Sequence, residues 1–284
     1  MKTVLDLYSH LFTSTQLKAF QSFFQQVQVL KIPEDLQLLQ QAEPRTTVVI
    51  IEKMSPYLAM KMMERGFAHC LSPEREDFRQ ELLASCLLLL KPRLLLASPS
   101  PFFLSSLASS SEDLEKFPPL LTFPVRWSRE KPAFLEALGK YLQQQKKTQA
   151  IEPLIHQIAD ELFANAIAAA EKSTKQESIA TTGAPIRFFC AVDEKSLMLG
   201  CEDSFGTLDR KSLLAHLSRI YSSETTAPNL DEGATGLGLK LVIDNSASVS
   251  VYCKKETQTI VACTLLLKGI RANAKPNKHF HLMI

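Results

Sequence analysis

The residues with the clearest potential for chemistry are three glycines, Gly233, Gly236 and Gly238, which fall within six positions of a 284-residue chain that has only nine glycines. An apolar run typical of a helix, residues 237–243, follows at once. Glycine lets backbone N–H groups approach a ligand, and the first turn of a helix supplies unpaired N–H donors and a partial positive charge. The segment is therefore predicted to cradle phosphate. The alternative is a glycine-rich turn before a buried helix.

The spacing of these glycines excludes two familiar phosphate-binding motifs. A P-loop requires Gly-Lys-Ser/Thr at its end, but Lys240 lies beyond the third glycine and is followed by Leu241. A dinucleotide-binding fingerprint requires a strand directly before the glycines, and residues 229–232, Asn-Leu-Asp-Glu, are not typical of a strand. A different kind of nucleotide site must be considered.

A carboxylate and an amide lie four residues apart at Glu161 and Asn165. The preceding residues carry apolar side chains at i, i+3 and i+4 spacing, which predicts an amphipathic helix from Ile151 with Pro153 in its first turn. Both polar side chains then project from one face of that helix, one turn apart. The alternative is the solvated side of an amphipathic helix.

Three segments together resemble the sequence boxes of the GHKL ATPases, the superfamily of gyrase, MutL, heat-shock ATPase chaperones, histidine kinases and anti-sigma serine kinases. Residues 160–166, Asp-Glu-Leu-Phe-Ala-Asn-Ala, resemble the N-box in its anti-sigma kinase form. Residues 201–207, Cys-Glu-Asp-Ser-Phe-Gly-Thr, resemble the first glycine box, and residues 233–239 resemble the second. The boxes occur in the family's order, and the resemblance covers about residues 119–270.

The resemblance implies a site for ATP and Mg²⁺. In such a site Asn165 holds Mg²⁺ through its amide oxygen, and Glu161 orients or deprotonates the nucleophile. Asp203 accepts a hydrogen bond from the adenine amino group, next to Gly206. Thr264 is expected beside the adenine, with a structural role in its strand as the alternative. The second glycine box contributes Gly233, Thr235, Gly236, Leu237 and Gly238.

The resemblance also implies a function. The chain resembles anti-sigma type serine/threonine kinases and partner-switching regulators, which implies a bacterial ATP–Mg²⁺-binding signalling protein. Its implied partner is a regulatory protein, anti-anti-sigma-like or sigma-like, and a homodimer is possible. The alternative is a non-catalytic nucleotide-sensing module that changes its partner surface through an ATP lid, residues 207–230. Phe205 stands where the family has a glycine, which keeps open a third reading, a scaffold that no longer binds nucleotide.

The predicted elements place these residues in an α/β protein with two domains. Residues 1–110 alternate strand-like and helix-like runs, which predicts a flavodoxin-like or receiver-like domain with a parallel sheet. Residues 111–118 are a predicted linker. Residues 119–284 are the predicted GHKL domain, an α/β sandwich with a mixed sheet and a basic C-terminal tail. Strands are predicted at residues 2–8, 27–32, 46–51, 68–71, 93–97, 120–127, 186–192, 196–201, 246–254 and 258–268, and helices at 15–25, 34–42, 56–65, 76–90, 128–145, from 151, at 210–221 and from 237.

Part of the first domain resembles a response-regulator receiver domain. Residues 46–90 are similar to its last two strand-helix units, with residues 65–73, Arg-Gly-Phe-Ala-His-Cys-Leu-Ser-Pro, where receivers have Gly-Ala, a strand and Lys-Pro. Ser72 replaces the lysine of that family, and no paired acids follow the first strand. We therefore predict a degenerate input domain without phosphoryl acceptance.

Composition narrows the class of protein further. The formal net charge is +2, with 32 basic and 30 acidic residues, so no global field would recruit nucleic acid or an anionic membrane. Six cysteines lie singly in apolar segments and are predicted to be reduced core residues of a cytoplasmic protein. Residues 87–97 are apolar but carry Lys91, Pro92 and Arg93, which is too interrupted for a membrane span.

Overall fold

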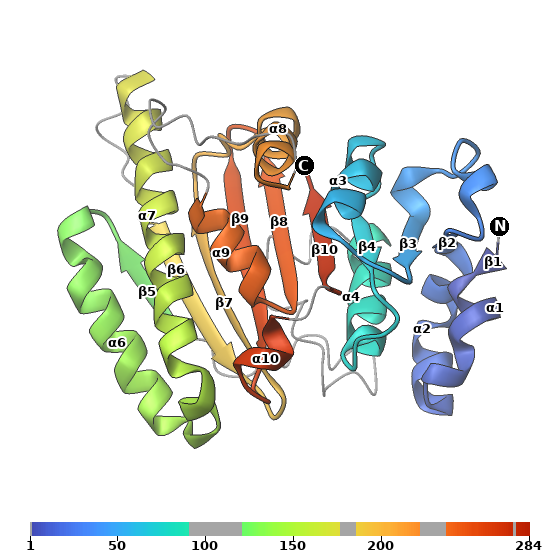
Figure 1. Ribbon diagram of the computed structural model, residues 1–284, viewed down its shortest axis with the longest axis horizontal. Coiled ribbons are helices and arrows are strands. Elements are labelled where there is room, and N and C mark those ends of the chain that lie inside the picture. The colour runs from blue at the N-terminus through green and yellow to red at the C-terminus, as the bar shows by residue number, and fades with distance from the viewer. Residues whose placement is uncertain (1, 91–120, 177–185, 222–236, 275–276) are drawn as a thin grey trace. The chain divides into compact units, whose positions relative to one another are not determined.

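The computed structural model describes residues 2–90, 121–176, 186–221, 237–274 and 277–284. The chain is a mixed α/β protein (Figure 1). It divides into two compact units: the first is Met1–Pro118 with Pro276–Leu282, and the second is Pro119–Lys275 with Met283–Ile284. Each unit is built around its own set of strands and is described by itself below.

The sheet of the first unit is mixed. Its strand order is β1-β2-β3-β4-β10, in which β2, β3 and β4 are parallel and β1 and β10 pair antiparallel with their neighbours. The strand β3 is buried along its whole length, as expected for a parallel strand covered on both faces. The strands are β1 (Lys2–Thr3), β2 (Gln28–Ile32), β3 (Thr47–Ile51), β4 (His69–Leu71) and β10 (His279–Met283).

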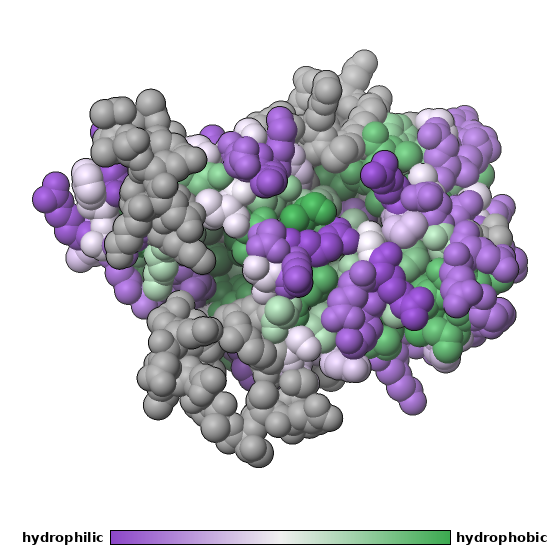
Figure 2. All heavy atoms as spheres, turned by 90° about the horizontal axis from the view of Figure 1, so that it is seen from above, coloured by the Kyte–Doolittle hydropathy of each residue, from purple (hydrophilic) through white to green (hydrophobic). Residues whose placement is uncertain are grey.

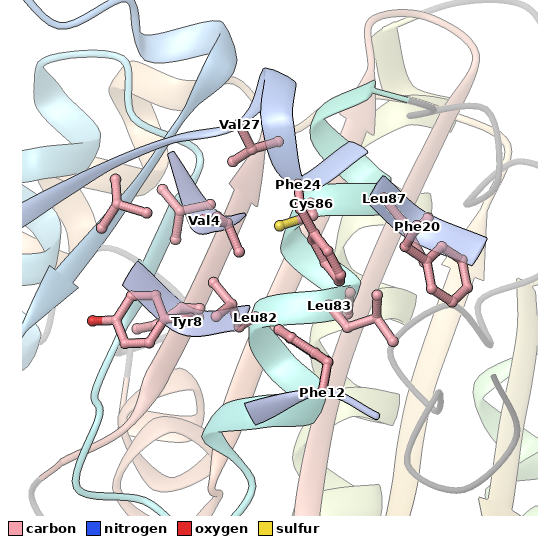
Figure 3. Close-up of a cluster of buried hydrophobic side chains, with 14 of the residues drawn as sticks. Val4, Tyr8, Phe12, Phe20, Phe24, Val27, Leu82, Leu83, Cys86 and Leu87 are labelled. Carbon is pink, nitrogen blue, oxygen red and sulfur yellow. The ribbon is translucent and has the colours of Figure 1, made fainter. Parts of the chain in front are cut away.

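Helices of the first unit enclose a buried apolar cluster (Figure 3). Rings from α1, α2, α4 and the turn before α2 meet there: Tyr8 contacts Phe78 edge-on with centroids 5.3 Å apart, and Phe12, just before α2, stacks on Phe24 at 4.5 Å. Aromatic pairs of this geometry add about 0.5–1.5 kcal/mol to the hydrophobic burial. The helices are α1 (Val4–Tyr8), α2 (Ser14–Gln26), α3 (Pro56–Glu64) and α4 (Phe78–Leu90), with short 3₁₀ turns at Ser9–Leu11, Leu36–Leu38 and Pro44–Thr46.

Two local predictions in this unit were wrong. Residues 4–8 form the helix α1 instead of continuing a strand, because Thr3 and Asp6 make a reciprocal capping box in which Thr3 N donates to Asp6 Oδ2 at 2.8 Å. The predicted helix at 34–42 is only the 3₁₀ turn Leu36–Leu38, since Asp35 Oδ2 accepts from Lys31 N and so favours a turn. The predicted strand at 93–97 lies outside the described residues.

The end of the chain was also predicted wrongly. The sequence suggested a basic tail, but His279–Met283 is the strand β10, paired antiparallel with β4. The backbone N–H of Leu282 donates to the carbonyl of Ala68 at 2.7 Å, and the side chains of His279 and His281 are buried. The hydrogen-bond partners of these buried rings lie about 200 positions earlier in the chain. The local charge of the sequence around residues 268–281 therefore does not reveal that the segment is buried.

The second unit has the strand order β8-β9-β7-β6-β5, and every described pair within it is antiparallel. These five strands therefore contribute only antiparallel pairs, while the chain as a whole contains a mixed sheet, as predicted. Short turns join β6 to β7 and β8 to β9, and short turns produce antiparallel pairs. The strands are β5 (Leu121–Val125), β6 (Ile186–Val192), β7 (Ser196–Asp203), β8 (Ser248–Lys254) and β9 (Gln258–Leu266).

Helices α6, α7 and α9 lie over one face of this sheet (Figure 1). Three aromatic rings connect the layers: Phe134 of α6 and Phe163 of α7 both contact Phe188 of β6, with centroids 4.6 and 5.3 Å away. This contact fixes α7 against the sheet and so orients its polar residues. The helices are α6 (Lys131–Gln144), α7 (Glu152–Gln176), α8 (Arg210–Tyr221), α9 (Leu237–Asn245) and α10 (Ile270–Asn273).

No described helix combines the length and the apolar character needed to cross a bilayer. On the face shown in Figure 2, hydrophilic and hydrophobic side chains are interspersed. Among the described residues, four large apolar side chains are well exposed, Leu36, Tyr57, Trp127 and Ile270. Single apolar side chains at a surface are ordinary.

Candidate functional site

Helix α7 positions the acid and the amide identified in the sequence. Its apolar stripe is buried against the sheet, so the remaining polar residues project away from the core. Glu161 is half-buried and Asn165 is exposed. The buried stripe consists of Ile151, Leu154, Ile155, Ile158 and Leu162.

The start of α9 lies directly against these two side chains. A Cβ built on Gly238 would be 2.0 Å from Oε2 of Glu161, 2.9 Å from its Cδ, and 3.6 Å from Nδ2 of Asn165. Gly238 stands in the first turn of α9, where backbone N–H groups have no intrahelical acceptor. Two of the three sequence boxes are therefore in contact, and the absence of a side chain at Gly238 is what permits that contact.

Most of the second glycine box lies outside the described residues. Gly233, Thr235 and Gly236 lie outside the described residues, and of Leu237 only the backbone is described, as the first residue of α9. The candidate site is accordingly built on Glu161, Asn165 and Gly238.

Asp203 ends β7 and is well buried, at 9% exposure. Its Oδ1 accepts hydrogen bonds from the backbone N–H of Phe205 at 2.8 Å and of Gly206 at 3.3 Å. Burial raises the pKa of the Asp203 carboxyl, and these hydrogen bonds, together with those from Thr259, act in the opposite direction. The carboxylate is thus held rigidly by its own turn.

Gly206 has a structural reason to be glycine. Its φ of +57° lies in the left-handed region, and a Cβ there would come within 2.3 Å of the carbonyl oxygen of Lys254. Its own carbonyl accepts from the backbone N–H of Glu256 at 3.1 Å. Close packing of the turn on the β8–β9 hairpin is enough to explain this residue, so its presence does not by itself indicate a ligand.

The structure does not bring Thr264 to Asp203. In the β7–β9 ladder Asp203 is opposite Thr259, whereas Thr264 is opposite Met198. Five residues of an extended strand separate the two threonines, about 16 Å at about 3.3 Å per residue. Thr259, which the sequence reading missed, is the threonine beside Asp203. Only the strand register identifies it, because both threonines occupy the same predicted strand.

Ion pairs and a hydrogen bond fix the helices around the site. Lys131 of α6 pairs with Asp160 of α7 at 2.6 Å. Asp244 near the end of α9 accepts from the hydroxyl of Tyr221 at 2.9 Å and also pairs with Lys240. Tyr221 is the last residue of α8, so α8 and α9 are joined at this point.

A cavity of about 310 Å³ lies elsewhere in the second unit. It is lined by Thr122, Pro124, Arg187, Glu202, Asp203 and Ser204. Arg187 and Glu202 are cross-strand partners and form an ion pair. Because Phe188 faces the helices, its neighbour Arg187 faces the opposite side of the sheet. The hollow therefore does not coincide with Glu161 and Asn165.

The described residues do not contain a complete metal site made of protein groups. No cluster of three or more His, Cys, Asp or Glu side chains with metal-binding geometry occurs among them. Mg²⁺ commonly takes only one or two protein oxygens and completes its shell with phosphate and water. The amide oxygen of Asn165 fits that incomplete type of site.

Comparison with known proteins adds no assignment to this geometry. A scan of the chain against models of protein families gives no match, and a search of curated proteins finds no matching relative. The residues and their arrangement therefore carry the case for a function.

Proposed function

We propose that residues 119–270 bind ATP with Mg²⁺ and act as a signalling protein of the GHKL type, with serine/threonine kinase chemistry. The observation that carries the proposal is the contact of Glu161 and Asn165 with Gly238 in the first turn of α9. The N-box resemblance and the glycine-box resemblance were separate predictions. Their meeting in space is what a common phosphate site requires.

Each residue has a role that its chemistry supports. The N–H groups at the start of α9 attract the anionic phosphates. Asn165 offers an amide oxygen to Mg²⁺, which when bound neutralises phosphate charge. Glu161 positions the attacking hydroxyl or water. Asp203, at the end of β7, would accept a hydrogen bond from the adenine amino group, as the resemblance implies.

Isothermal titration with ATP, with and without Mg²⁺, tests the site. Asn165→Ala should abolish the Mg²⁺-dependent part of ATP affinity, because it removes the metal ligand. Glu161→Ala should lower transfer of labelled γ-phosphate by roughly 100-fold or more with little change in affinity, since a positioning carboxylate acts mainly in the transition state. No ATP binding by the folded wild-type chain would end the proposal.

A second candidate is a nucleotide sensor without catalysis, and the hydrogen bond between Tyr221 and Asp244 favours it. This bond ties α8 to α9, so a ligand at the start of α9 would also influence the surface of α8. Under this alternative Glu161→Ala behaves as wild type in ATP binding and partner association. Tight ATP binding without phosphate transfer by wild type would select the sensor over the kinase.

The proposal also covers the protein that the chain binds and the role of the first unit. We propose a regulatory protein partner of anti-anti-sigma or sigma type, in the cytoplasm. The first unit would serve as a flavodoxin-like or receiver-like input domain, and its support is the parallel order of β2, β3 and β4 with α3 between the last two. Co-purification of partners, followed by labelled-phosphate transfer to them, tests this part.

A further inference from the structure

Three buried histidines hold the C-terminal strand in the first unit. His69 lies on β4, and His279 and His281 lie on β10. All three side chains are at most 1% exposed. His69 and His281 are cross-strand partners, and their Nδ1 atoms are 2.8 Å apart. A hydrogen bond between two such nitrogens needs one ring to donate and the other to accept.

On the side of His281 away from His69, a carboxyl group from α4 contacts the ring. Nε2 of His281 is 2.9 Å from Oε2 of Glu81, a residue that is also buried. Nε2 of His69 is buried and has no hydrogen-bond partner among the described residues. A proton added to His69 at Nε2 would therefore have no acceptor among the described residues.

His279 makes its hydrogen bonds with a second set of residues, Ser72 and Asp77, and Arg75 offsets the charge of Asp77. Its Nδ1 accepts from the backbone N–H of Ser72 at 3.3 Å, so its proton is on Nε2, which donates to Oδ1 of Asp77 at 3.2 Å. The Arg75 guanidinium also donates to Asp77, from Nε at 3.0 Å, and to the carbonyl of Asn277 at 2.8 Å. The charge of Asp77 is thus balanced by Arg75, and this group needs no further proton.

The remaining titratable neighbour is Cys70 on β4. Its sulfur lies 3.9 Å from the carbonyl oxygen of Ala59 on α3. Burial raises the pKa of this thiol, so it stays neutral. Among the described residues, the charged or titratable groups that act on the ring pair are Glu81 of α4, which contacts His281, and Asp77 and His279, which influence the pKa of His281.

We propose that the ring pair His69–His281 is a proton-operated latch that releases β10 from β4 on mild acidification. Protonation of both rings while β10 stays on β4 would set N–H donors face to face across 2.8 Å and bury two like charges together, so protons bind preferentially to the separated state. Separation of β10 from β4 removes both penalties, because each imidazolium then reaches water. The latch is distinct from the nucleotide site and does not depend on it.

The direction of the pH effect follows from the burial. Burial lowers the pKa of His69 well below its usual range, and the nearby His281 lowers it further. Burial, together with His279, lowers the pKa of His281 to about 3, and Asp77 acts in the opposite direction. A ring with a depressed folded pKa contributes full stability above its ordinary pKa of about 6.5 and loses it as pH falls from there. Burial raises the pKa of Asp77, but the nearby His279 and Arg75 lower it more strongly, so loss of that interaction belongs to a more acidic range.

Amide hydrogen exchange on the full chain tests the latch. The probe is the N–H of Leu282, which donates to Ala68, and the reference is the amides of β3. Protection factors, corrected for intrinsic exchange, should fall at Leu282 by about 10-fold for one titrating ring and about 100-fold for two between pH 7.5 and 5.5. The β3 amides should keep their protection. Constant protection at Leu282 overturns the latch, and an equal loss in β3 overturns it too, because the whole unit would then be unfolding.

Variants assign the effect to the ring pair. His281→Gln should reduce a 100-fold response to about 10-fold, and combining it with His69→Gln should leave Leu282 protection independent of pH, because glutamine amides do not titrate. The matched control is His10→Gln, an exposed histidine of the same unit, which should respond as wild type. A full wild-type response in the double variant overturns the assignment. The wild-type profile remains decisive where a variant fails to fold.

Discussion

Gly238→Ala offers a direct test of the contact between α7 and α9. The added methyl would be built 2.0 Å from Oε2 of Glu161, and real side chains essentially never approach closer than 3.0 Å. The carboxylate must therefore move by about 1 Å, whereas the amide of Asn165, 3.6 Å away, is in ordinary contact. The substitution shifts the proposed positioning group and leaves the proposed metal ligand in place.

Gly238→Ala is expected to change the rate of phosphate transfer far more than the free energy of unfolding. Alanine gains up to about 1 kcal/mol over glycine in a helix, and rotation of the Glu161 side chain costs about 0.5–1.5 kcal/mol. These terms nearly cancel, so we expect the free energy of unfolding to stay within about 1 kcal/mol of wild type. A displacement of about 1 Å at a reacting centre can cost about 100-fold in rate. We therefore expect phosphate transfer to fall about 100-fold with nearly unchanged Mg²⁺-dependent ATP affinity.

The matched control is Gly139→Ala in α6 of the same unit. A Cβ at Gly139 meets only the His156 ring, at 3.8 Å or more, so nothing has to move. We expect wild-type transfer and a slightly higher free energy of unfolding. Transfer and ATP affinity are measured by γ-labelled ATP and calorimetry, and stability by urea denaturation. A folded Gly238→Ala protein with wild-type transfer would refute the role given to Glu161.

Four further outcomes follow from the structure. Asp203→Ala should weaken ATP and ADP binding alike, by about 1–3 kcal/mol for an unpaired buried donor, and calorimetry showing normal ADP affinity would exclude Asp203 from the adenine site. Thr259→Val should weaken the same affinities while Thr264→Val should not, and the reverse order would contradict the β7–β9 register as the guide to the site. Gly206→Ala should lower the free energy of unfolding by at least about 1–2 kcal/mol, measured in urea, because a Cβ is strained at positive φ. All six cysteines are buried and should resist a thiol reagent at pH 8 until urea unfolds the chain, so rapid labelling of the native protein would contradict their burial.

The sequence by itself determined most of the local elements. The predicted helix at 56–65 begins where α3 begins, because Ser55 Oγ accepts from Leu58 N at 3.1 Å and Pro56 is the first helical residue. The predicted helix at 210–221 coincides with α8. Glu161 and Asn165 were correctly placed on one helix. These features are fixed by residues within one or two turns of each other, so a local reading contains the necessary information.

Only the tertiary structure decided which elements meet. The sequence could not place Gly238 against Glu161, because that contact depends on how α7 and α9 pack on the sheet. It could not show that Thr259, and not Thr264, lies beside Asp203, since this depends on the register between β7 and β9. It misread the last residues as a tail, because the partner of His281 is Glu81, some 200 positions earlier. Hydrogen bonds and packing between distant segments carry this information, and a pattern along the chain does not contain it.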